Sequence, residues 1–242
     1  MNSTRYVVRD GGIYLIHADH AVFNNIAWCG IVCRLHGLTP ISGEGIWGLC
    51  SKAPEYYPDI ITFRRQVTSD EVNDFIGNRE VFGIKDSFAN LDMLPFGFRV
   101  LFDAKWIYHP PVVDLDDHLR GWIVVSTAEA FAQWTFASGL QKVLQPALLE
   151  EKDVKIFMYE IHGEKSGFVA NLSDHVVGIS NVFSNENKMI WPDIVRIVSA
   201  YFPGVPMVGY EKGEALAAAL QSGWTTLGPL RVWIKANPTE NE

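Results

Sequence analysis

The most informative segment of the chain for its architecture reads VGYEKGEALAAALQSGWTTLGPLRVWIK, residues 208–235. Its apolar start is typical of a strand, and its alanine-rich middle, residues 213–221, is typical of a helix. The pair Gly223-Trp224 ends that helix, and a further apolar run at residues 230–234 predicts another strand. This order of elements suits a helix that packs closely across a sheet.

The whole chain has the composition of a globular protein. It has 242 residues, of which 48% are hydrophobic, 20% charged and 12% aromatic, enough for one large domain or two small ones. Its apolar runs are short, whereas a membrane span needs about 20 consecutive apolar residues. The N-terminal sequence MNSTRYVVRDGG also lacks the apolar stretch of a secretory signal. We therefore expect no membrane span and a cytoplasmic location.

The charge and the reactive residue types exclude several classes of function. A formal net charge of −8 argues against nucleic acid as a partner, because phosphates need a basic surface. No nucleophile elbow, P-loop or dinucleotide-binding glycine motif is present. His17, Asp19 and His20 form the one tight cluster of metal-ligand types, but two histidines are too few to hold an ion. We therefore interpret these three residues as the start of a helix and expect no metal.

The first half of the chain alternates helix, loop and strand patterns. Residues 18–35 predict a helix whose buried face would carry Val22, Phe23, Ile26, Ala27 and Ile31. The stretch GLTPISGEGIWGLCSKAPEYYPD, which is rich in glycine and proline, predicts a loop. We expect strands at residues 60–63, 81–84 and 98–102, and a short helix that is capped at residue 68 and runs through residue 76. The half therefore reads as α+β.

The best candidate for a domain boundary is IYHPPVVDLDDHLRG, residues 107–121, which carries a proline pair and a run of charge. It predicts a divergent N-terminal half, residues 1–110, and a second domain, residues 120–242. The second domain has the predicted order β-α-β-β-β-α-β-α-β, with a helix that opens at Trp191-Pro192. GFRVLFDAKWI, from residue 97, resembles GWTTLGPLRVWI, from residue 223, so the N-terminal half can also be interpreted as a second, degenerate copy.

In this order of elements, and in the ending LAAALQSGW of residues 216–224, the second half resembles the GNAT superfamily, the Gcn5-related N-acetyltransferases. The resemblance implies an α+β fold with a mixed, mostly antiparallel sheet flanked by helices. In that fold two parallel strands splay apart, and an acyl-CoA thioester enters the gap between them. Here the splayed strands would be residues 176–183 and 206–211.

The resemblance also implies a set of site residues. The backbone of Ser180, Asn181 and Val182 would hold acetyl-CoA or another acyl-CoA, and Asn185 and Lys188 would contact its phosphates. Glu211 would act as a base or position the amine, and Tyr210 would act as a proton donor. The implied function is acyl transfer from CoA to a small amine or a peptide.

Two departures from the family pattern support an alternative. The phosphate loop reads NVFSNENKMIWPD, without the usual glycines, and Ala219 stands where the family often carries the tyrosine that protonates the leaving thiolate. The alternative is a non-catalytic GNAT-like protein with a degenerate cofactor site. An open gap between the strands of Gly178 and Gly209 would favour the enzyme, and a gap filled by large side chains would favour the alternative.

One further segment, GIKDSFANLDMLPFGF at residues 83–98, places polar residues between apolar ones. It predicts either the lining of a substrate cleft or, the interpretation we favour, a turn held by side-chain bonds to the backbone.

Overall fold

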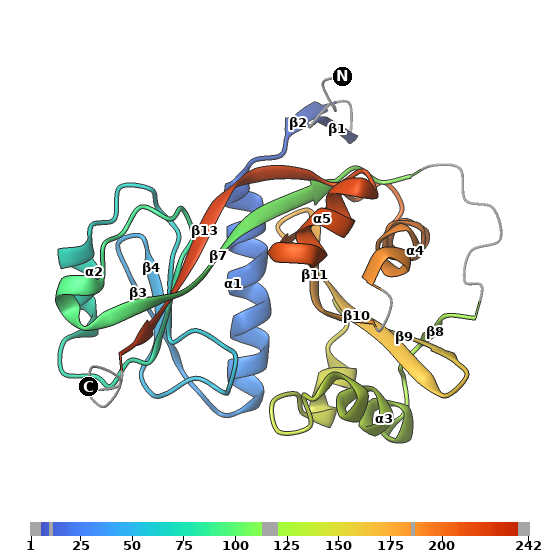
Figure 1. Cartoon of the computed structure of the whole chain (residues 1–242), viewed down its shortest axis with the longest axis horizontal. Coiled ribbons are helices and arrows are strands. Elements are labelled where there is room, and N and C mark those ends of the chain that lie inside the picture. Colours follow the sequence, from blue (N-terminus) through green and yellow to red (C-terminus); the bar gives the residue numbers. More distant parts are fainter. Residues whose placement is uncertain (1–5, 10–11, 113–120, 185–186, 237–242) are drawn as a thin grey trace. The chain divides into compact units, whose positions relative to one another are not determined.

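The computed structural model describes residues 6–9, 12–112, 121–184 and 187–236, with the side chains of residues 15–112, 121–184 and 190–236. The chain folds as α+β in two compact units, residues 1–28 with 105–227 and residues 29–104 with 228–242. These units differ from the contiguous halves expected from the sequence, 1–110 and 120–242. The reason is that α1 (Ala18–Leu35), β7 (Phe98–His109) and β13 (Thr225–Lys235) each begin in one unit and end in the other (Figure 1). A hairpin, β1 (Tyr6–Arg9) and β2 (Gly12–Leu15), precedes α1.

The larger unit is built on six strands in the order β8-β9-β10-β11-β12-β7. They are β8 (Ile123–Val124), β9 (Val154–Ile161), β10 (Glu164–Ser173), β11 (Val176–Phe183), β12 (Met207–Glu211) and the end of β7. All neighbours are antiparallel except β11 and β12, which are parallel and joined by α4 (Asn187–Tyr201). The antiparallel meander of β9, β10 and β11 confirms the sequence prediction. The parallel pair follows it because a helical crossover returns the chain in the same direction.

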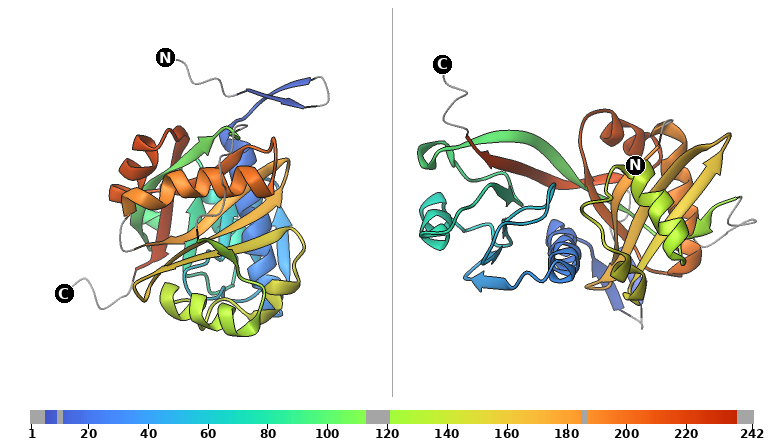
Figure 2. Two further views of the ribbon diagram at one scale, coloured as in Figure 1. Left: turned by 90° about the vertical axis from the view of Figure 1, so that its right-hand side faces the viewer. Right: turned by 90° about the horizontal axis from the view of Figure 1, so that it is seen from below.

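Helices cover both faces of this sheet. α4 and α5 (Gly213–Gln221) lie on one face, and α3 (Ala128–Ser138) lies on the other (Figures 1 and 2). Beneath α4 and α5 the core is almost entirely apolar and includes Phe157, Phe168, Ile194, Val198, Met207, Ala219 and Trp224. Between α3 and β9 lies the short 3-10 helix η2 (Pro146–Glu150). We call the face under α4 and α5 the core face and the other the α1 face, because the first half of α1 also packs there.

Two helices differ in detail from the prediction. α4 begins at Asn187, about one turn before the predicted start at Pro192, so the proline lies inside the helix. α1 has the predicted bounds, but Phe23 is 43% exposed, whereas Trp28, Val32 and Cys33 are buried. The predicted buried face is therefore confirmed at Val22, which is 0% exposed, and was wrong at Phe23, because the helix turns the polar Asn24 inward instead.

Asn24 is buried because it binds the hairpin between β10 and β11. Its amide nitrogen donates to the carbonyl oxygens of Asn171 (3.1 Å), Val176 (3.2 Å) and Ser173 (3.4 Å). Its amide oxygen accepts from Nδ2 of Asn171 at 3.1 Å. These bonds satisfy a buried polar side chain and fasten α1 to the sheet of the larger unit.

The smaller unit has five strands in the order β3-β4-β5-β6-β13. They are β3 (Pro40–Gly43), β4 (Ile46–Leu49), β5 (Ile60–Thr62), β6 (Gly83–Asp86) and the second part of β13. β5 and β6 are parallel and joined by α2 (Ser69–Ile76), which begins at the predicted Thr68 cap. Its core contains Ile60, Val72, Ile84, Met93, Phe98 and Trp233. The 3-10 helix η1 (Leu94–Phe96) precedes β7.

The predicted loop at residues 37–59 was wrong, because part of it is the hairpin of β3 and β4. Glu44 and Gly45 form a two-residue turn, and Gly45 has the positive φ of 86° that such turns require. Trp47 and Leu49 of the second strand are buried. The glycines that indicated a loop therefore serve the turn, whereas Ile46, Trp47 and Leu49 build the core. Among the described residues no helix is both long and apolar enough to cross a membrane.

Candidate functional site

The parallel strands β11 and β12 separate soon after they meet. Only two residue pairs join them, Val177 with Met207 and Gly178 with Val208, although both strands continue for several residues. Gly209 allows a last close approach, because a side chain there would lie 3.0 Å from the carbonyl oxygen of Ile179. The strands therefore splay beyond this point, as the sequence led us to expect.

A β-bulge interrupts the pairing of β11 with β10 next to the splay. The register between β10 and β11 shifts by one residue between Val169, which pairs with Ser180, and Gly167, which pairs with Phe183. Asn181 lies in the bulge and has a left-handed φ of 52°. Of the predicted cofactor positions, Ser180 is thus the last regularly paired residue before the bulge, and the backbone of Asn181 and Val182 lies outside the regular pairing.

Two polar atoms at the bulge are buried and lack a partner. Neither Oγ of Ser180 nor Oδ1 of Asn181 forms a hydrogen bond within the described part of the chain. Val182 packs against the apolar core of the larger unit. Since a buried polar group is normally bonded, the two free atoms mark a place where a bound molecule would gain hydrogen bonds.

The two residues expected to contact phosphates are only partly described. Asn185 lies outside the described residues. Lys188 falls in the first turn of α4, and its side chain lies outside the described part of the structure. Both predictions therefore stay predictions.

Glu211 ends β12, directly beyond the splay. Burial raises the pKa of its carboxyl to about 7, and the backbone N–H and the positive charge of Lys212 oppose that rise. A carboxyl group with a pKa near neutrality can both give and accept a proton at pH 7.

Tyr210 and Glu211 lie on opposite faces of the sheet. Met207 of the same strand is packed in the core under α4 and α5, so alternation along the strand places Glu211 on that core face as well. The ring of Tyr210 lies on the α1 face, in edge-to-face contact with Trp106 of β7, with the ring centroids 5.5 Å apart. The two predicted catalytic residues are therefore neighbours at the splay, but their side chains lie on different faces of the sheet.

Tyr210 lines a small pocket on the α1 face of the larger unit, which we call the α1-face pocket. Asn24, Asn25 and Trp28 of α1, Trp106 of β7 and Ser180 of β11 also line it. It lies where β11 and β12 separate, since Gly178 and Val208, the last paired residues, are part of its lining. The space left in it is about 10 Å³, roughly that of one water molecule. The splay is therefore nearly filled on this face by aromatic and amide side chains.

Asn24, Asn25, Trp28 and Trp106 belong to the site but were not predicted from the sequence. They lie on α1 and β7, far in sequence from the splayed strands, and no motif marks them. His109 was also missed: its ring lies 5.5 Å from that of Trp224, and burial lowers its pKa. Its Nδ1 lies 2.6 Å from the carbonyl oxygen of Pro110.

Ala219, the residue that replaces the family's tyrosine, is completely buried in the core under α4 and α5. Its neighbours there include Trp224, which follows the glycine of the helix-ending turn. Ala219 carries no proton donor, and Glu211 is the titratable residue that β12 supplies on the same face.

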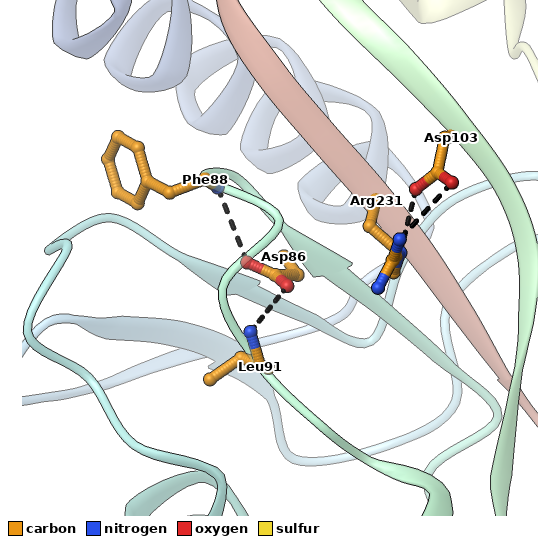
Figure 3. A network of polar contacts seen from close by, with 5 residues as sticks. All are labelled: Asp86, Phe88, Leu91, Asp103 and Arg231. Atoms are coloured by element: carbon orange, nitrogen blue, oxygen red, sulfur yellow. Dashed lines mark hydrogen bonds and ion pairs between the residues drawn. The ribbon is translucent and has the colours of Figure 1, made fainter.

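In the smaller unit the segment of residues 83–98 is a turn system, as favoured from the sequence. The carboxylate of Asp86 is buried and accepts hydrogen bonds from the backbone N–H groups of Leu91 (2.9 Å) and Phe88 (3.3 Å) (Figure 3). Burial raises the pKa of Asp86, and these bonds lower it. Close by, Arg231 binds both oxygens of Asp103, at 2.7 and 3.2 Å. Asp86 thus holds the backbone of the turn, and the Arg231–Asp103 pair joins β13 to β7, so these charged groups have a structural role.

The parallel strands of the smaller unit, β5 and β6, are held together beyond their ladder by a side-chain hydrogen bond. After the pairs Ile60 with Ile84 and Ile61 with Lys85, the backbone N–H of Ser87 donates to Oγ1 of Thr62 at 3.1 Å. Both residues are buried. This bond joins β5 and the end of β6 beyond their last paired residues.

The described part of the chain holds no group of three His, Cys, Asp or Glu side chains arranged for a metal ion. The backbone N–H of His17 donates to Nδ1 of His20 at 3.2 Å, as expected for residues at the start of a helix.

Comparison with known proteins supports the fold. No protein-family model matches the sequence, and no curated protein matches it. A conserved protein of unknown function from Staphylococcus epidermidis has a similar structure, with a TM-score of 0.58 at 11% identity over 83% of this chain and 94% of that one. A protein from Novosphingobium aromaticivorans, provisionally assigned to the GNAT acetyltransferases, matches with a TM-score of 0.56 at 12% identity over 90% and 96%. The chain therefore has a divergent GNAT-like fold, which confirms the resemblance seen in its sequence.

Proposed function

We propose that this protein is an acyl-CoA-dependent N-acyltransferase that acts on a small amine or a peptide. The observation that carries the proposal is the splay of β11 and β12 after two residue pairs, with a carboxyl group of pKa about 7 at its edge. A thioester in this gap would meet the free backbone and the unpaired polar atoms of the bulge at Ser180 and Asn181.

The two faces of the gap suggest how the substrates enter. α4 follows the bulge on the core face, and the amides at a helix N-terminus favour phosphate. The acyl-CoA would therefore approach from the core face, and the amine from the α1 face. The amine nitrogen attacks the thioester carbon, a C–N bond forms, the C–S bond breaks, and the sulfur leaves with the electron pair.

The positions of Glu211 and Tyr210 exchange the roles that the sequence suggested. Glu211 lies on the core face, where the sulfur leaves, and a carboxylic acid with a pKa near 7 can protonate a thiolate. It would thus replace the tyrosine that is absent at Ala219. Tyr210 lies on the α1 face, where its hydroxyl would accept a hydrogen bond from the entering amine and pass the released proton to water.

The smaller unit would be a second, degenerate copy of the same fold. In the smaller unit β3, β4 and β5 are antiparallel, and β5 and β6 form a parallel pair joined by α2. β6 then pairs with β13, just as β12 of the larger unit pairs with β7. β13 and β7 are the segments whose sequences resemble each other. Since Thr62 and Ser87 close its gap, this unit would not bind acyl-CoA.

A non-catalytic protein is the second candidate, and the small volume of the α1-face pocket favours it. Calorimetry with acetyl-CoA separates the two. The acyltransferase predicts saturable binding, and acetylation of a mixed panel of primary amines that is detected by mass spectrometry. No heat and no thermal shift at millimolar acetyl-CoA would overturn it.

A further inference from the structure

The walls of the α1-face pocket are uncharged. Trp28, Trp106 and Tyr210 provide aromatic surface, and the polar contributions come from Asn24, Asn25, Asn171 and Ser180. Within the described part of the chain, no Lys, Arg, His, Asp or Glu side chain is among the residues that line it. A ligand in the pocket would therefore meet no charge that could balance its own.

The polar groups of the pocket differ in whether they can form a further hydrogen bond to a ligand. Asn24 already uses its amide in four hydrogen bonds to the hairpin of β10 and β11. Oγ of Ser180 is buried and has no hydrogen-bond partner within the described chain. A group that enters the pocket would thus gain a hydrogen bond at Ser180, and a group with both donor and acceptor capacity, such as a neutral amine, fits a hydroxyl best.

The pocket is also narrow. Its free space of about 10 Å³ holds one non-hydrogen atom of the size of water. Trp28 and Trp106, which are 3% and 1% exposed, leave little room for their rings to move aside.

From these observations we propose that the α1-face pocket receives the amino group of the acceptor and selects a primary amine on an unbranched, uncharged carbon chain. The inference rests on the proposed acyl transfer and names its substrate class. Amines with a carboxylate or phosphate close to the nitrogen would be rejected, because an anion would lose its hydration without gaining a partner. Amines branched at the carbon next to nitrogen would be rejected by the two tryptophans.

The same surroundings assist the chemistry. An uncharged pocket disfavours an ammonium ion relative to the free amine, so it lowers the pKa of the bound amine and delivers the nucleophilic form. The nitrogen then attacks the thioester carbon across the gap and loses its proton toward Tyr210, while the thiolate receives one from Glu211.

The test compares three amines of similar size with the full-length protein and saturating acetyl-CoA: n-propylamine, β-alanine and isopropylamine. We expect kcat/KM for β-alanine to be at least about a hundredfold below that for n-propylamine. For isopropylamine we expect a loss of about tenfold or more. Equal use of β-alanine or of isopropylamine would overturn the inference and leave the acyltransferase proposal standing.

A substitution locates the effect in the pocket. Trp28→Ala should raise the use of isopropylamine relative to n-propylamine by about tenfold and leave the rejection of β-alanine unchanged, because it adds space but no charge. Trp28→Phe, which keeps an aromatic wall, should change the ratio much less, and it serves if the alanine variant does not fold. An unchanged isopropylamine ratio in both folded variants contradicts the role of Trp28.

A binding experiment keeps the inference testable without turnover. Saturation-transfer NMR with the protein and unacylated CoA should show contact for n-propylamine and none for β-alanine. If acetyl-CoA neither binds nor reacts, the proposed function fails. The amine signals then decide separately whether the pocket selects as inferred, and contact for both amines or for neither overturns the selectivity.

Discussion

The amide oxygen of Asn24 occupies the space directly above Gly178, so a side chain at residue 178 would collide with it. Gly178 is one of the last paired residues before β11 and β12 separate. The contact fastens α1 to the sheet at the point where the gap opens. It also explains why a glycine stands in the middle of β11, since a larger residue would not fit beneath Asn24.

Gly178→Ala should therefore destabilise the protein strongly. The added methyl group would meet Asn24 and also lie 2.6 Å from Oδ1 of Asn171. We expect a loss of about 2–4 kcal/mol in the free energy of unfolding, measured by urea denaturation. Gly30→Ala is the matched control: no atom lies within 4 Å of its new methyl group, so it should stabilise α1 by up to about 1 kcal/mol. Equal effects of the two substitutions would contradict this account.

Asn24→Asp tests the hydrogen bonds themselves. The shape of the side chain is kept, but an ionised carboxylate cannot donate to the carbonyl oxygens of Asn171, Ser173 and Val176. We expect a loss of about 3 kcal/mol or more, because a buried charge is left among acceptors. A stability close to that of the unmodified protein would show that the contacts are not maintained in solution.

Glu211 should make stability depend on pH in an unusual direction. Its folded pKa of about 7 lies above the ordinary value of 4.5, so between these values the folded state holds a proton that the unfolded state has lost. The contribution of Glu211 to stability therefore decreases as pH rises through that window, by at most about 3 kcal/mol. The free energy of unfolding of Glu211→Gln, measured relative to that of the unmodified protein, should therefore be higher at pH 8 than at pH 5. The exposed Glu214, replaced by Gln, controls for the loss of one negative charge, and a parallel result for both variants would argue against burial of Glu211.

The same residue predicts a pH dependence of catalysis. If protonated Glu211 donates to the thiolate, kcat should decrease as pH rises above about 7. Glu211→Gln should lower kcat by about a hundredfold and lose this decrease. Steady-state acetylation rates between pH 5.5 and 9 provide the measurement. A variant that keeps the same decreasing limb would assign the acid to another group.

Substitution of two aspartates of the smaller unit should affect the free energy of unfolding very differently. Asp86 is fully buried and accepts the backbone N–H groups of Phe88 and Leu91, so Asp86→Ala should cost about 2–4 kcal/mol. The side chain of Asp103 is 60% exposed in its ion pair with Arg231, so Asp103→Ala should cost less than about 1 kcal/mol. Thermal unfolding of both variants checks this order, and a larger effect at Asp103 would reverse the interpretation of the network.

The number of binding sites tests the proposal that the smaller unit is a second copy of the fold whose gap is closed. Because Ser87 bonds to Thr62 where the strands would open, we expect one acetyl-CoA per chain by calorimetry. Two equivalent sites would show that the second gap opens in solution.

Local patterns of the sequence were sufficient for much of the fold. The helix of residues 18–35, the Thr68 cap, the meander of β9, β10 and β11 and the ending from Met207 to Lys235 follow from periodicity, capping and turn chemistry, which act over a few residues. The fold class followed from the order of these elements. The hairpin of β3 and β4 could not be predicted in this way, because glycine and proline are as frequent in the turn of a hairpin as in a loop.

Most of the elements and their order could thus be predicted from the sequence, because they depend on neighbours along the chain, and the resemblance to the GNAT superfamily implied which strands would splay. The face that each side chain of the site occupies depends on the tertiary fold instead. There Asn24 and Trp28 lie against a sheet far away in sequence, Tyr210 and Glu211 lie on opposite faces, and Ser87 is bonded to Thr62. Such contacts join residues 25 to 152 positions apart, and their geometry depends on packing that no local pattern records.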